Sequence, residues 1–200
     1  REYDWDLLKD HRVNWQEAFG NDRPLRIEIG MGKGKFLAGM AARDQDINFV
    51  GIEKFSSVLI RAVQRIGRME EEGTDLSNVR LIRADAERIE DIFEERSVDR
   101  IFLNFSDPWP KDRHAKRRLT SEQFLKRYER ILKKDGDIVF KTDNRVFFDF
   151  SLEEIERSGW IIEEMTYDLG DSDPDNITTE YEDRFRSEGV KICRVIAKRP

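Results

Sequence analysis

Short apolar runs alternate with amphipathic segments along most of the chain. Runs rich in Ile, Val, Leu and Phe predict buried strands, and apolar residues at three- and four-residue spacing predict helices between them. The predicted strands cover residues 25–30, 48–53, 79–84, 98–104, 137–142 and 190–197, and a seventh begins at 159–162. The predicted helices cover residues 36–42, 55–69, 89–93, 122–133, 147–155 and 178–186. This alternation is typical of an α/β fold with a mostly parallel seven-stranded sheet and helices on both faces.

The first 24 residues carry a different pattern. An amphipathic helix over residues 4–19 is predicted by the spacing of Trp5, Leu8, Trp15, Ala18 and Phe19. Residues 20–24 contain Gly20 and Pro24, which would end that helix. We expect one domain over residues 1–200, with an N-terminal helical segment at 1–24 and a core at 25–200. The tryptophans suit core packing, and they also make this helix a candidate homodimer interface.

Composition narrows the class of protein. The chain has 200 residues, 38% hydrophobic and 39% charged, which suits a soluble protein with a heavily charged surface. It has no apolar run of membrane-spanning length and no signal-peptide core at its start. The only cysteine, Cys193, excludes an internal disulfide and suits a reducing cytoplasm. His11 and His114 show no metal-ligand spacing, so we expect a cytoplasmic protein without a metal or a membrane partner.

The distribution of charge matters more than its sum. The net charge is −6, but residues 111–134 contain ten cationic residues and only three acidic ones. A locally basic face on an acidic protein is compatible with an RNA partner.

A glycine-rich turn follows the first predicted core strand. Gly30, Gly32 and Gly34 alternate with other residues, and Glu28 lies two residues before the first of them. This spacing differs from the Gly-x-Gly-x-x-Gly fingerprint of dinucleotide-binding proteins. It resembles the first motif of S-adenosylmethionine-dependent methyltransferases. In that motif the glycines let the backbone approach the amino-acid end of the cofactor, and the acid serves its ammonium group or orders the site.

Acidic residues follow the next two predicted strands. Glu53 ends the second strand, where a carboxylate can bind ribose hydroxyls, although it could also serve as an acid at the start of a helix. Asp85 and Ala86 follow the third strand, where the carboxylate could accept the exocyclic amine of adenine. Three strands that end in acids predict a nucleoside-binding edge of the sheet.

The loop after the fourth predicted strand carries the most distinctive residues. Pro108 and Pro110 end the strand and stiffen a turn that presents Asp107 and Trp109, with basic residues just downstream. A carboxylate, an aromatic ring and a cationic track suit an enzyme that acts on a nucleobase. The alternative is a solvated charged loop in which Asp107 only caps the turn.

Seven groups of residues make the chain resemble the bacterial tRNA (guanine-N7-)-methyltransferase family, from about residue 25 to residue 197. They are Glu-Ile-Gly-Met-Gly-Lys-Gly at 28–34, Gly-Ile-Glu at 51–53, Asp-Ala at 85–86, Asn-Phe-Ser-Asp-Pro-Trp-Pro-Lys at 104–111, Arg-His-Ala-Lys-Arg-Arg at 113–118, Lys-Thr-Asp at 141–143 and Thr-Glu-Tyr-Glu at 179–182. The loop at 104–111 and the basic hexapeptide after it are the specific part of the resemblance.

The resemblance implies a Rossmann-like class I methyltransferase fold and methyl transfer from S-adenosyl-L-methionine to N7 of a guanosine in the tRNA variable loop. It implies that the cofactor contacts Glu28, Gly30, Gly32, Gly34, Glu53, Asp85, Ala86 and Asp107. The implied tRNA substrate residues are Lys111, Asp143, Thr179, Glu180, Tyr181 and Glu182, and the implied RNA-contact stretch holds Arg113, His114, Lys116, Arg117 and Arg118. Family members usually begin with a longer, basic segment, which the acidic-to-neutral residues 1–24 do not match.

The implied chemistry suits the residue types. Guanine N7 presents a lone pair, so its methylation needs no general base. We assign Asp107, at the family's catalytic position, to stabilise the positive charge that develops on the purine. We assign Asp143 to the N1–H and amino donors of guanine; its alternative role is a helix N-cap.

Two other functions stay open on the residues alone. One is a nucleic-acid adenine N6-methyltransferase, because Asp-Pro-Trp-Pro loosely resembles an Asp-Pro-Pro-aromatic loop, but that chemistry leaves the basic hexapeptide unexplained. The other is a non-catalytic RNA-binding module on the same fold, which the three retained strand-end acids disfavour. The glycine spacing disfavours a nicotinamide dehydrogenase.

Overall fold

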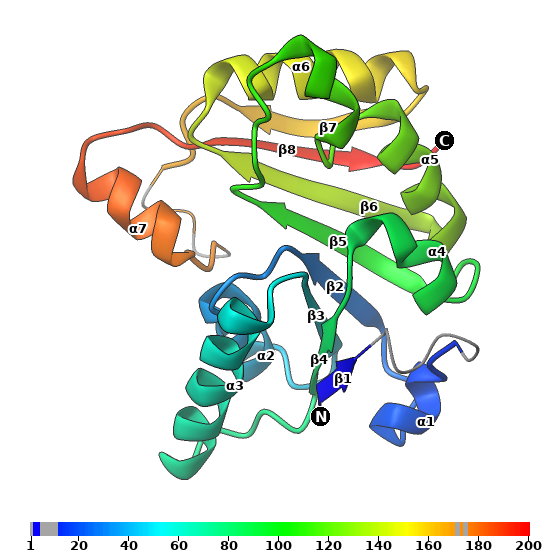
Figure 1. The fold of residues 1–200 in the computed structure, drawn as a ribbon, viewed down its shortest axis with the longest axis vertical. Helices are drawn as coiled ribbons and strands as arrows, with labels where there is room; N and C mark the ends of the chain where they lie inside the picture. Colours follow the sequence, from blue (N-terminus) through cyan, green and yellow to red (C-terminus); the bar gives the residue numbers. More distant parts are fainter. Residues whose placement is uncertain (1, 5–11, 171–172, 174–175) are drawn as a thin grey trace.

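A single sheet runs through the molecule, and its strands lie in the order β1-β4-β3-β2-β5-β6-β8-β7 (Figure 1). The computed structural model describes residues 2–4, 12–170, 173 and 176–200. The strands are β1 Glu2–Asp4, β2 Leu25–Ile29, β3 Asn48–Glu53, β4 Val79–Arg83, β5 Val98–Asn104, β6 Leu132–Thr142, β7 Ile161–Thr166 and β8 Cys193–Lys198. All neighbours pair in parallel except β8, which is antiparallel to both β6 and β7.

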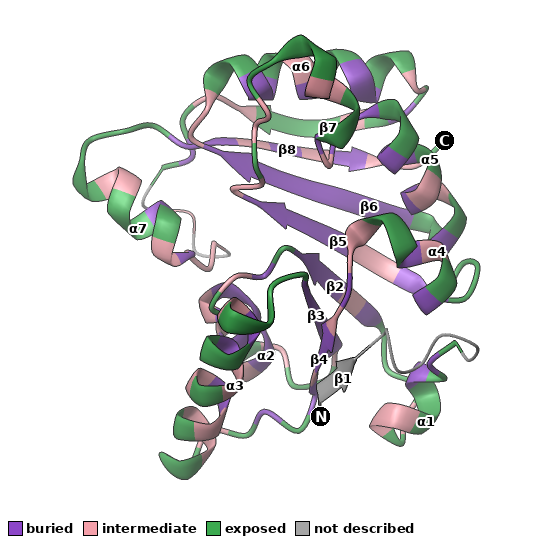
Figure 2. Cartoon of the chain, in the orientation of Figure 1, coloured by how far each residue is buried: buried purple, intermediate pink, exposed green. Residues whose placement is uncertain are grey.

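Helices cover both faces of this sheet. They are α1 Trp15–Phe19, α2 Lys35–Arg43, α3 Ser56–Glu71, α4 Ile89–Ile92, α5 Glu122–Ile131, α6 Arg145–Arg157 and α7 Glu180–Ser187, with short 3-10 helices at Ala86–Arg88 and Asp112–Arg117. Apolar residues of α2 and α3 pack in one core cluster, and those of α4, α5 and α6 pack in the other. Figure 2 shows the central strands buried between these layers and the outer faces of the helices exposed.

The chain reverses its direction of growth across the sheet between β2 and β5. After β2 it adds β3 and β4 on one side, and it then returns to place β5 and β6 on the other side. In an open parallel sheet, such a reversal leaves a crevice at the carboxyl ends of the two strands that flank it. The sheet topology therefore places a binding site at the ends of β2 and β5.

The predicted elements of the core agree with this structure. The seven predicted strands are β2 to β8, and β3 and β5 have the predicted bounds. Three starts were predicted wrongly: β6 begins at Leu132, directly after α5, β7 begins at Ile161, and β8 begins at Cys193, where its pairing with Thr142 of β6 starts. Strand bounds follow from pairing partners, which apolar patterns alone do not specify.

The predicted helix over residues 4–19 is wrong in its extent. Asp4 lies in β1 and pairs with Arg83 of β4, which makes β1 an eighth strand at the edge of the sheet. The helical part is α1, which begins after the N-cap Asn14 and ends at Gly20. Trp5 and Leu8 lie outside the described residues. A three-residue edge strand carries too little periodic signal to compete with the helical spacing around it.

The start of α5 is capped from a distance. Ser121 occupies the N-cap position, but its hydroxyl donates to the Lys116 carbonyl, and the Thr120 hydroxyl bonds that of Ser151. The carboxylate of Glu154 in α6 instead accepts a hydrogen bond from the Glu122 N–H at 2.6 Å. This contact ties α5 to α6. None of the helices in the described ranges is both long and apolar enough to cross a bilayer.

We predict that Gly51→Ala destabilises the fold by about 1–3 kcal/mol, because overpacking in a dense core forces side chains out of place. An added Cβ would lie 2.2 Å from Sδ of Met31 and 2.6 Å from Leu37. The control is Gly67→Ala in α3, where nothing lies within 4 Å and alanine should stabilise the helix by about 0.5–1 kcal/mol. Urea unfolding measures both changes, and a Gly51→Ala protein as stable as wild type would contradict the packing of β3 against the glycine turn.

Candidate active site

A cleft of about 320 Å³ lies at the carboxyl ends of β2, β3, β4 and β5, where the topology predicts a binding site. The predicted site residues that line it are Gly30, Gly32, Glu53, Asp85, Ala86, Asp107, Arg117 and Tyr181. They come from six separate segments of the chain. The fold therefore joins the predicted cofactor acids, the loop after β5 and the first turn of α7 in one cleft.

The glycine turn forms one wall of the cleft. Gly30 and Gly32 have φ angles of 73° and 59°, and a Cβ on either would meet no atom within 4 Å. A side chain there would therefore project into open space, which leaves the backbone accessible to a ligand. Gly34 differs, because its Cβ would lie 3.0 Å from that of Ala62. Gly34 thus allows α2 and α3 to pack closely and does not line the cleft.

Two of the strand-end acids lie at the cleft and also bond the backbone. Glu53 accepts hydrogen bonds from the N–H groups of Gly32 at 3.2 Å and Phe55 at 2.9 Å, so it ties the glycine turn to the start of α3. Asp85 accepts from the Glu87 N–H at 3.0 Å and pairs with Lys54 at 2.6 Å. Burial alone would raise the pKa of Asp85, but the Glu87 N–H and Lys54 outweigh it and the pKa is lowered.

Glu28 lies near the end of β2 and is fully buried, so this predicted cofactor residue does not itself line the cleft. Its Oε1 accepts a hydrogen bond from Asn104 at 2.8 Å, whereas its Oε2 and the Asn104 Oδ1 have no partner in the described structure. Burial raises the pKa of Glu28 to about 8, against the opposing effects of Asn104 and Lys141. With that pKa the carboxyl is mostly protonated at neutral pH, and once ionised it would favour a ligand that donates hydrogen bonds and carries a positive charge.

The loop after β5 holds Asp107 at the cleft in a strained backbone. Phe105 and Trp109 have φ angles of 51° and 42°, in the left-handed region that bulky residues rarely adopt. Asp107 is exposed, and its carboxylate has no hydrogen bond to any described residue. Trp109 lines the cleft, and its ring centre lies 5.7 Å from that of His114 in an edge-to-face arrangement. Backbone strain of this kind gathers at functional sites.

Asp143 leaves β6 beside this loop. Asn104 pairs with Lys141 in the ladder between β5 and β6, so Asp107 and Asp143 follow neighbouring strands at the same edge of the sheet. Asp143 does not line the cleft. The alternative role as a helix N-cap is wrong, because Asn144 caps α6 and accepts the Phe147 N–H at 2.9 Å.

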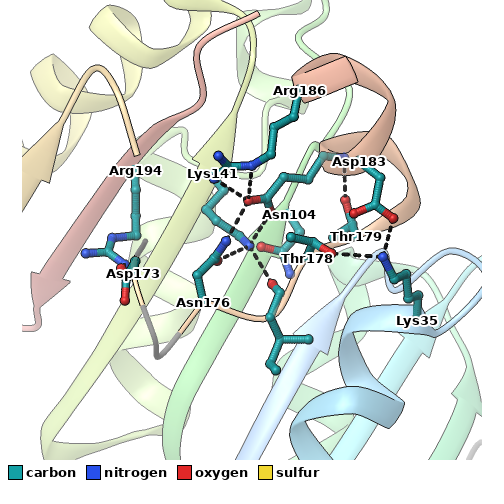
Figure 3. A network of polar contacts seen from close by, with 12 residues as sticks. Lys35, Asn104, Lys141, Asp173, Asn176, Thr178, Thr179, Asp183, Arg186 and Arg194 are labelled. Carbon is teal, nitrogen blue, oxygen red and sulfur yellow. Dashed lines mark hydrogen bonds and ion pairs between the residues drawn. The ribbon is translucent and has the colours of Figure 1, made fainter. Parts of the chain in front are cut away.

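A buried polar network fixes α7 against the end of β6 (Figure 3). Lys141 is 2% exposed, and its ammonium donates to Glu182 at 2.7 Å, to Asn176 at 2.9 Å and to the Ile177 carbonyl at 3.0 Å. Glu182 is wholly buried and also accepts from Asn176 and Arg186. Burial opposes its ionisation, yet Lys141 and these donors lower the pKa of Glu182. Burial also lowers the pKa of Lys141, against the opposing effect of Glu182. The contacts to Lys141, Asn176 and Arg186 favour the charged form of Glu182 inside the protein.

The other polar residues of the predicted substrate segment also have hydrogen-bond or ion-pair partners within the protein. Thr179 caps α7 by accepting the Glu182 N–H at 2.9 Å, and Glu180 pairs with Arg65 of α3. Lys35 of α2 bonds both Thr178 and Asp183, as Figure 3 shows. Tyr181 differs from these residues, because it is 58% exposed and its ring stacks on Phe105 at the cleft. The structure therefore brings Tyr181 to the cleft and leaves Thr179, Glu180 and Glu182 beside it.

The basic residues near the cleft fall into two groups. Lys111, Arg113 and Lys116 are exposed in the segment that follows the Asp107 loop, and this exposed basic surface is called the rim here. Arg117 lies 5.0 Å from the ring centre of Trp109. Arg118 is only 8% exposed. In α5 and the start of β6 the cations pair with acids, as in Lys126–Glu122, Arg130–Glu90 and Lys133–Asp99. Within residues 111–134, the exposed cations without a described acidic partner are therefore mostly next to the loop that carries Asp107.

Sequence analysis missed two contributors. Lys141 interrupts the apolar strand 138–142, and a lysine at a buried strand position requires a buried partner, so this signal was present. Phe105 supports the loop by stacking on Tyr181 and Phe185, and nothing in the sequence marked its contact with α7.

Neither a cluster of metal ligands within the described residues nor a second, larger hollow competes with this cleft. Across residues 12–170, 173 and 176–200 no group of His, Cys, Asp and Glu side chains could hold a metal ion. A hollow of about 450 Å³ lies over the middle of the sheet beside α2. Its arginines already have partners, with Arg100 bound to Asp137 and Arg194 to Asp173.

Comparisons with known proteins agree with this geometry. Residues 22–195 match the family described as "Putative methyltransferase". A tRNA (guanine-N(7)-)-methyltransferase of Lachnoclostridium phytofermentans is 56% identical over 92% of this chain and 85% of its own length. The Bacillus subtilis protein of the same name is 46% identical, also over 92% of this chain and 85% of its own length.

Solved structures show the same fold at low identity. The 16S rRNA methyltransferase KamB has a TM-score of 0.71 at 12% identity and covers 96% of each chain. An antibiotic-related methyltransferase has a TM-score of 0.68 at 19% identity and covers 92% of each chain. The chain therefore has the Rossmann-like class I methyltransferase fold.

We predict that Lys141→Met destabilises the protein by about 3–5 kcal/mol, because it leaves the Glu182 carboxylate buried without its lysine. The matched control is Lys126→Met, which removes an exposed lysine from its pair with Glu122 and should leave the unfolding midpoint unchanged. Guanidinium unfolding compares the two. Adding Glu182→Gln to Lys141→Met should recover part of the loss; equal stability of Lys141→Met and wild type would mean that the pair does not anchor α7.

Proposed function

The chain belongs to the tRNA (guanine-N(7)-)-methyltransferase family, and from that membership we propose how its cleft acts. The enzyme transfers a methyl group from S-adenosyl-L-methionine to N7 of a guanosine in tRNA. We place the cofactor in the cleft at the ends of β2, β3, β4 and β5, and the guanine beside Asp107. The observation that carries the proposal is the convergence of the strand-end acids and the Asp107 loop on this one cleft.

The residues of the cleft fit S-adenosylmethionine. The buried Glu28 and Asn104 acceptors without donors match the ammonium group of its amino-acid end. The open backbone at Gly30 and Gly32 leaves room beside them. We assign the ribose hydroxyls to Glu53, and the adenine amine to Asp85 next to Ala86. Gly34 supports this site by letting α2 pack against α3.

The catalytic role falls to Asp107. When bound, the cofactor supplies a methyl group from a cationic sulfonium, and the positive charge that arrives with it develops on the purine. Asp107 is exposed at the cleft and has no hydrogen bond among the described residues that would compete for its carboxylate. It can therefore stabilise that charge electrostatically. Most of the acceleration should come from positioning guanine N7 in line with the methyl group.

We assign recognition of the tRNA to the rim and to α7. Asp143 grips the N1–H and amino donors of guanine, and Tyr181 offers an exposed ring on which a base can stack. Thr179, Glu180 and Glu182 fix the position of this segment. Lys111, Arg113, His114, Lys116 and Arg117 supply the surface for the phosphates of the variable loop.

The remaining parts of the proposal concern the setting of the enzyme. We propose that it works in the cytoplasm, with tRNA as its macromolecular partner and without a metal. We also propose that residues 25–200 form the catalytic core and that the enzyme forms a homodimer. Trp15 of α1 is buried and stacks on Phe93 in the protein's own core, so this tryptophan belongs to core packing.

We predict that Asp107→Ala lowers kcat by about 10²-fold, the loss expected when one preorganised electrostatic group is removed from a transition state. Methyl transfer from labelled S-adenosylmethionine to unmodified tRNA, followed by nucleoside analysis, measures it. Wild type should place the label in 7-methylguanosine. Equal activity of the variant would remove Asp107 from the chemistry, whereas label in another nucleoside would overturn the substrate assignment. Cofactor affinity, measured by calorimetry, shows whether the variant keeps its cofactor.

We predict that cofactor affinity rises with pH between 6 and about 8. Glu28 has a pKa of about 8, so below that pH it is mostly protonated, and binding of an ammonium group must release the proton. The same raised pKa means that folding stability falls as the pH rises from the ordinary value of 4.5 towards 8. Glu28→Gln should abolish the rise in affinity with pH and weaken cofactor binding.

The control ligand for Glu28 is 5′-methylthioadenosine, which lacks the amino-acid end. Its affinity should not depend on pH and should be equal in wild type and Glu28→Gln. Isothermal titration calorimetry in buffers of different ionisation enthalpy counts the released protons. A flat pH profile for S-adenosylmethionine, or the same rise for methylthioadenosine, would separate Glu28 from the ammonium group.

A further inference from the structure

Arg118 is the buried member of the basic hexapeptide. Arg113, Lys116 and Arg117 are exposed, whereas Arg118 is 8% exposed. Within the described part of the chain no carboxylate pairs with it. A buried guanidinium needs other partners to offset its lost hydration. The surroundings of Arg118 therefore differ from those of an exposed arginine that is available to bind a phosphate.

The partners of Arg118 are the two carbonyls of the Asp107 loop. Its Nε donates to the Pro108 carbonyl at 2.9 Å, and its Nη2 donates to the Trp109 carbonyl at 3.1 Å. Its guanidinium carbon lies 4.2 Å from the ring centre of Phe150 in α6. Only the planar, forked side chain of arginine can bridge two consecutive carbonyls while it stacks on a ring.

These contacts hold the loop on one side of Asp107, and a second set holds it on the other. Phe105 donates its N–H to the Lys141 carbonyl at 2.9 Å, and its ring stacks on Tyr181 and Phe185 of α7. Trp109, on the Arg118 side, has a left-handed backbone that is unfavourable unless its surroundings enforce it. Because the Asp107 carboxylate has no described hydrogen bond, the backbone held on both sides determines where it lies.

We propose that Arg118 is a positioning residue that fixes the Asp107 loop in its reactive geometry and does not contact the tRNA. The inference rests on the proposed function, because it takes Asp107 as the group that faces guanine. It separates Arg118 from the other basic residues of the hexapeptide. Loss of the Arg118 fork should lower kcat, whereas loss of a rim cation should weaken tRNA binding.

The test compares four variants. Arg118→Lys keeps the charge and removes the fork, and Phe150→Leu removes the stacking surface. Arg113→Gln removes an exposed rim cation. Arg80→Lys is the matched structural control, because Arg80 also donates to a carbonyl, that of Ala18 at 2.7 Å, and stacks on Phe19 at 4.6 Å. It lies towards the amino end of β4, away from the cleft.

Steady-state kinetics at several salt concentrations separate the two roles. We expect Arg118→Lys to lower kcat at least tenfold with an unchanged KM for tRNA and an unchanged salt dependence. Phe150→Leu should lower kcat less, and Arg80→Lys should keep it. Arg113→Gln should raise KM for tRNA and reduce the slope of log affinity against log salt by about one. An Arg118→Lys enzyme with the kcat of wild type, or one that behaves like Arg113→Gln, would overturn the proposal.

Hydrogen exchange of the protein without tRNA gives a readout that does not depend on activity. The amides of residues 105–107 and 109 should exchange faster in Arg118→Lys than in Arg80→Lys, while those of α5 stay unchanged. Equal exchange in the two variants would count against the positioning role. If wild type forms no 7-methylguanosine, the proposed function fails, and the exchange experiment still decides whether Arg118 holds the loop.

Discussion

Burial of the central strands is the constraint on which the rest of the molecule depends. Strands β2, β3 and β5 lie between helical layers and are buried for most of their length. Ionised side chains cannot occupy such interiors without partners, so they collect where the strands end. The reversal of strand order between β2 and β5 leaves those ends without a covering helix. Glu53, Asp85 and Asp107 line one cleft because each of them ends or follows a buried strand at this edge of the sheet.

Buried polar groups at this edge of the sheet are of two kinds, and the difference separates support from binding. Lys141 and Glu182 have their hydrogen bonds made within the protein, so they stabilise one position of α7. Glu28 and Asn104 each keep an acceptor without a donor. The first kind holds α7 in place, and the second kind supports the proposal that a ligand donates a hydrogen bond there. The two kinds of group also interact electrostatically: burial raises the pKa of Glu28, and the charge of Lys141 lowers it.

The sequence predicted those parts of the site that follow from local pattern. Glu53 and Asp85 end apolar runs, and Asp107 follows a run closed by two prolines, so strand periodicity alone placed them at one edge. The strands of the core were predicted for the same reason. The roles of Glu182 and Arg118 could not be predicted, because each depends on a partner distant in sequence or on the path of a loop. The short strand β1 was missed because only its pairing with β4 defines it.

The distribution of charge explains how an acidic protein can act on RNA. Methylation at N7 turns a neutral purine into a cation, so a cleft lined by carboxylates favours the product side of the charge transfer. The phosphates of the same substrate would be repelled by those carboxylates. The protein keeps the two kinds of charge apart in space. The carboxylates at the cleft are those of Glu53, Asp85 and Asp107. The cations Lys111, Arg113 and Lys116 are exposed in the segment after the Asp107 loop. The loop that carries Asp107 joins both regions. In the function proposed above, the path of this loop would hold the base at the acids while the phosphates lie on the exposed cations.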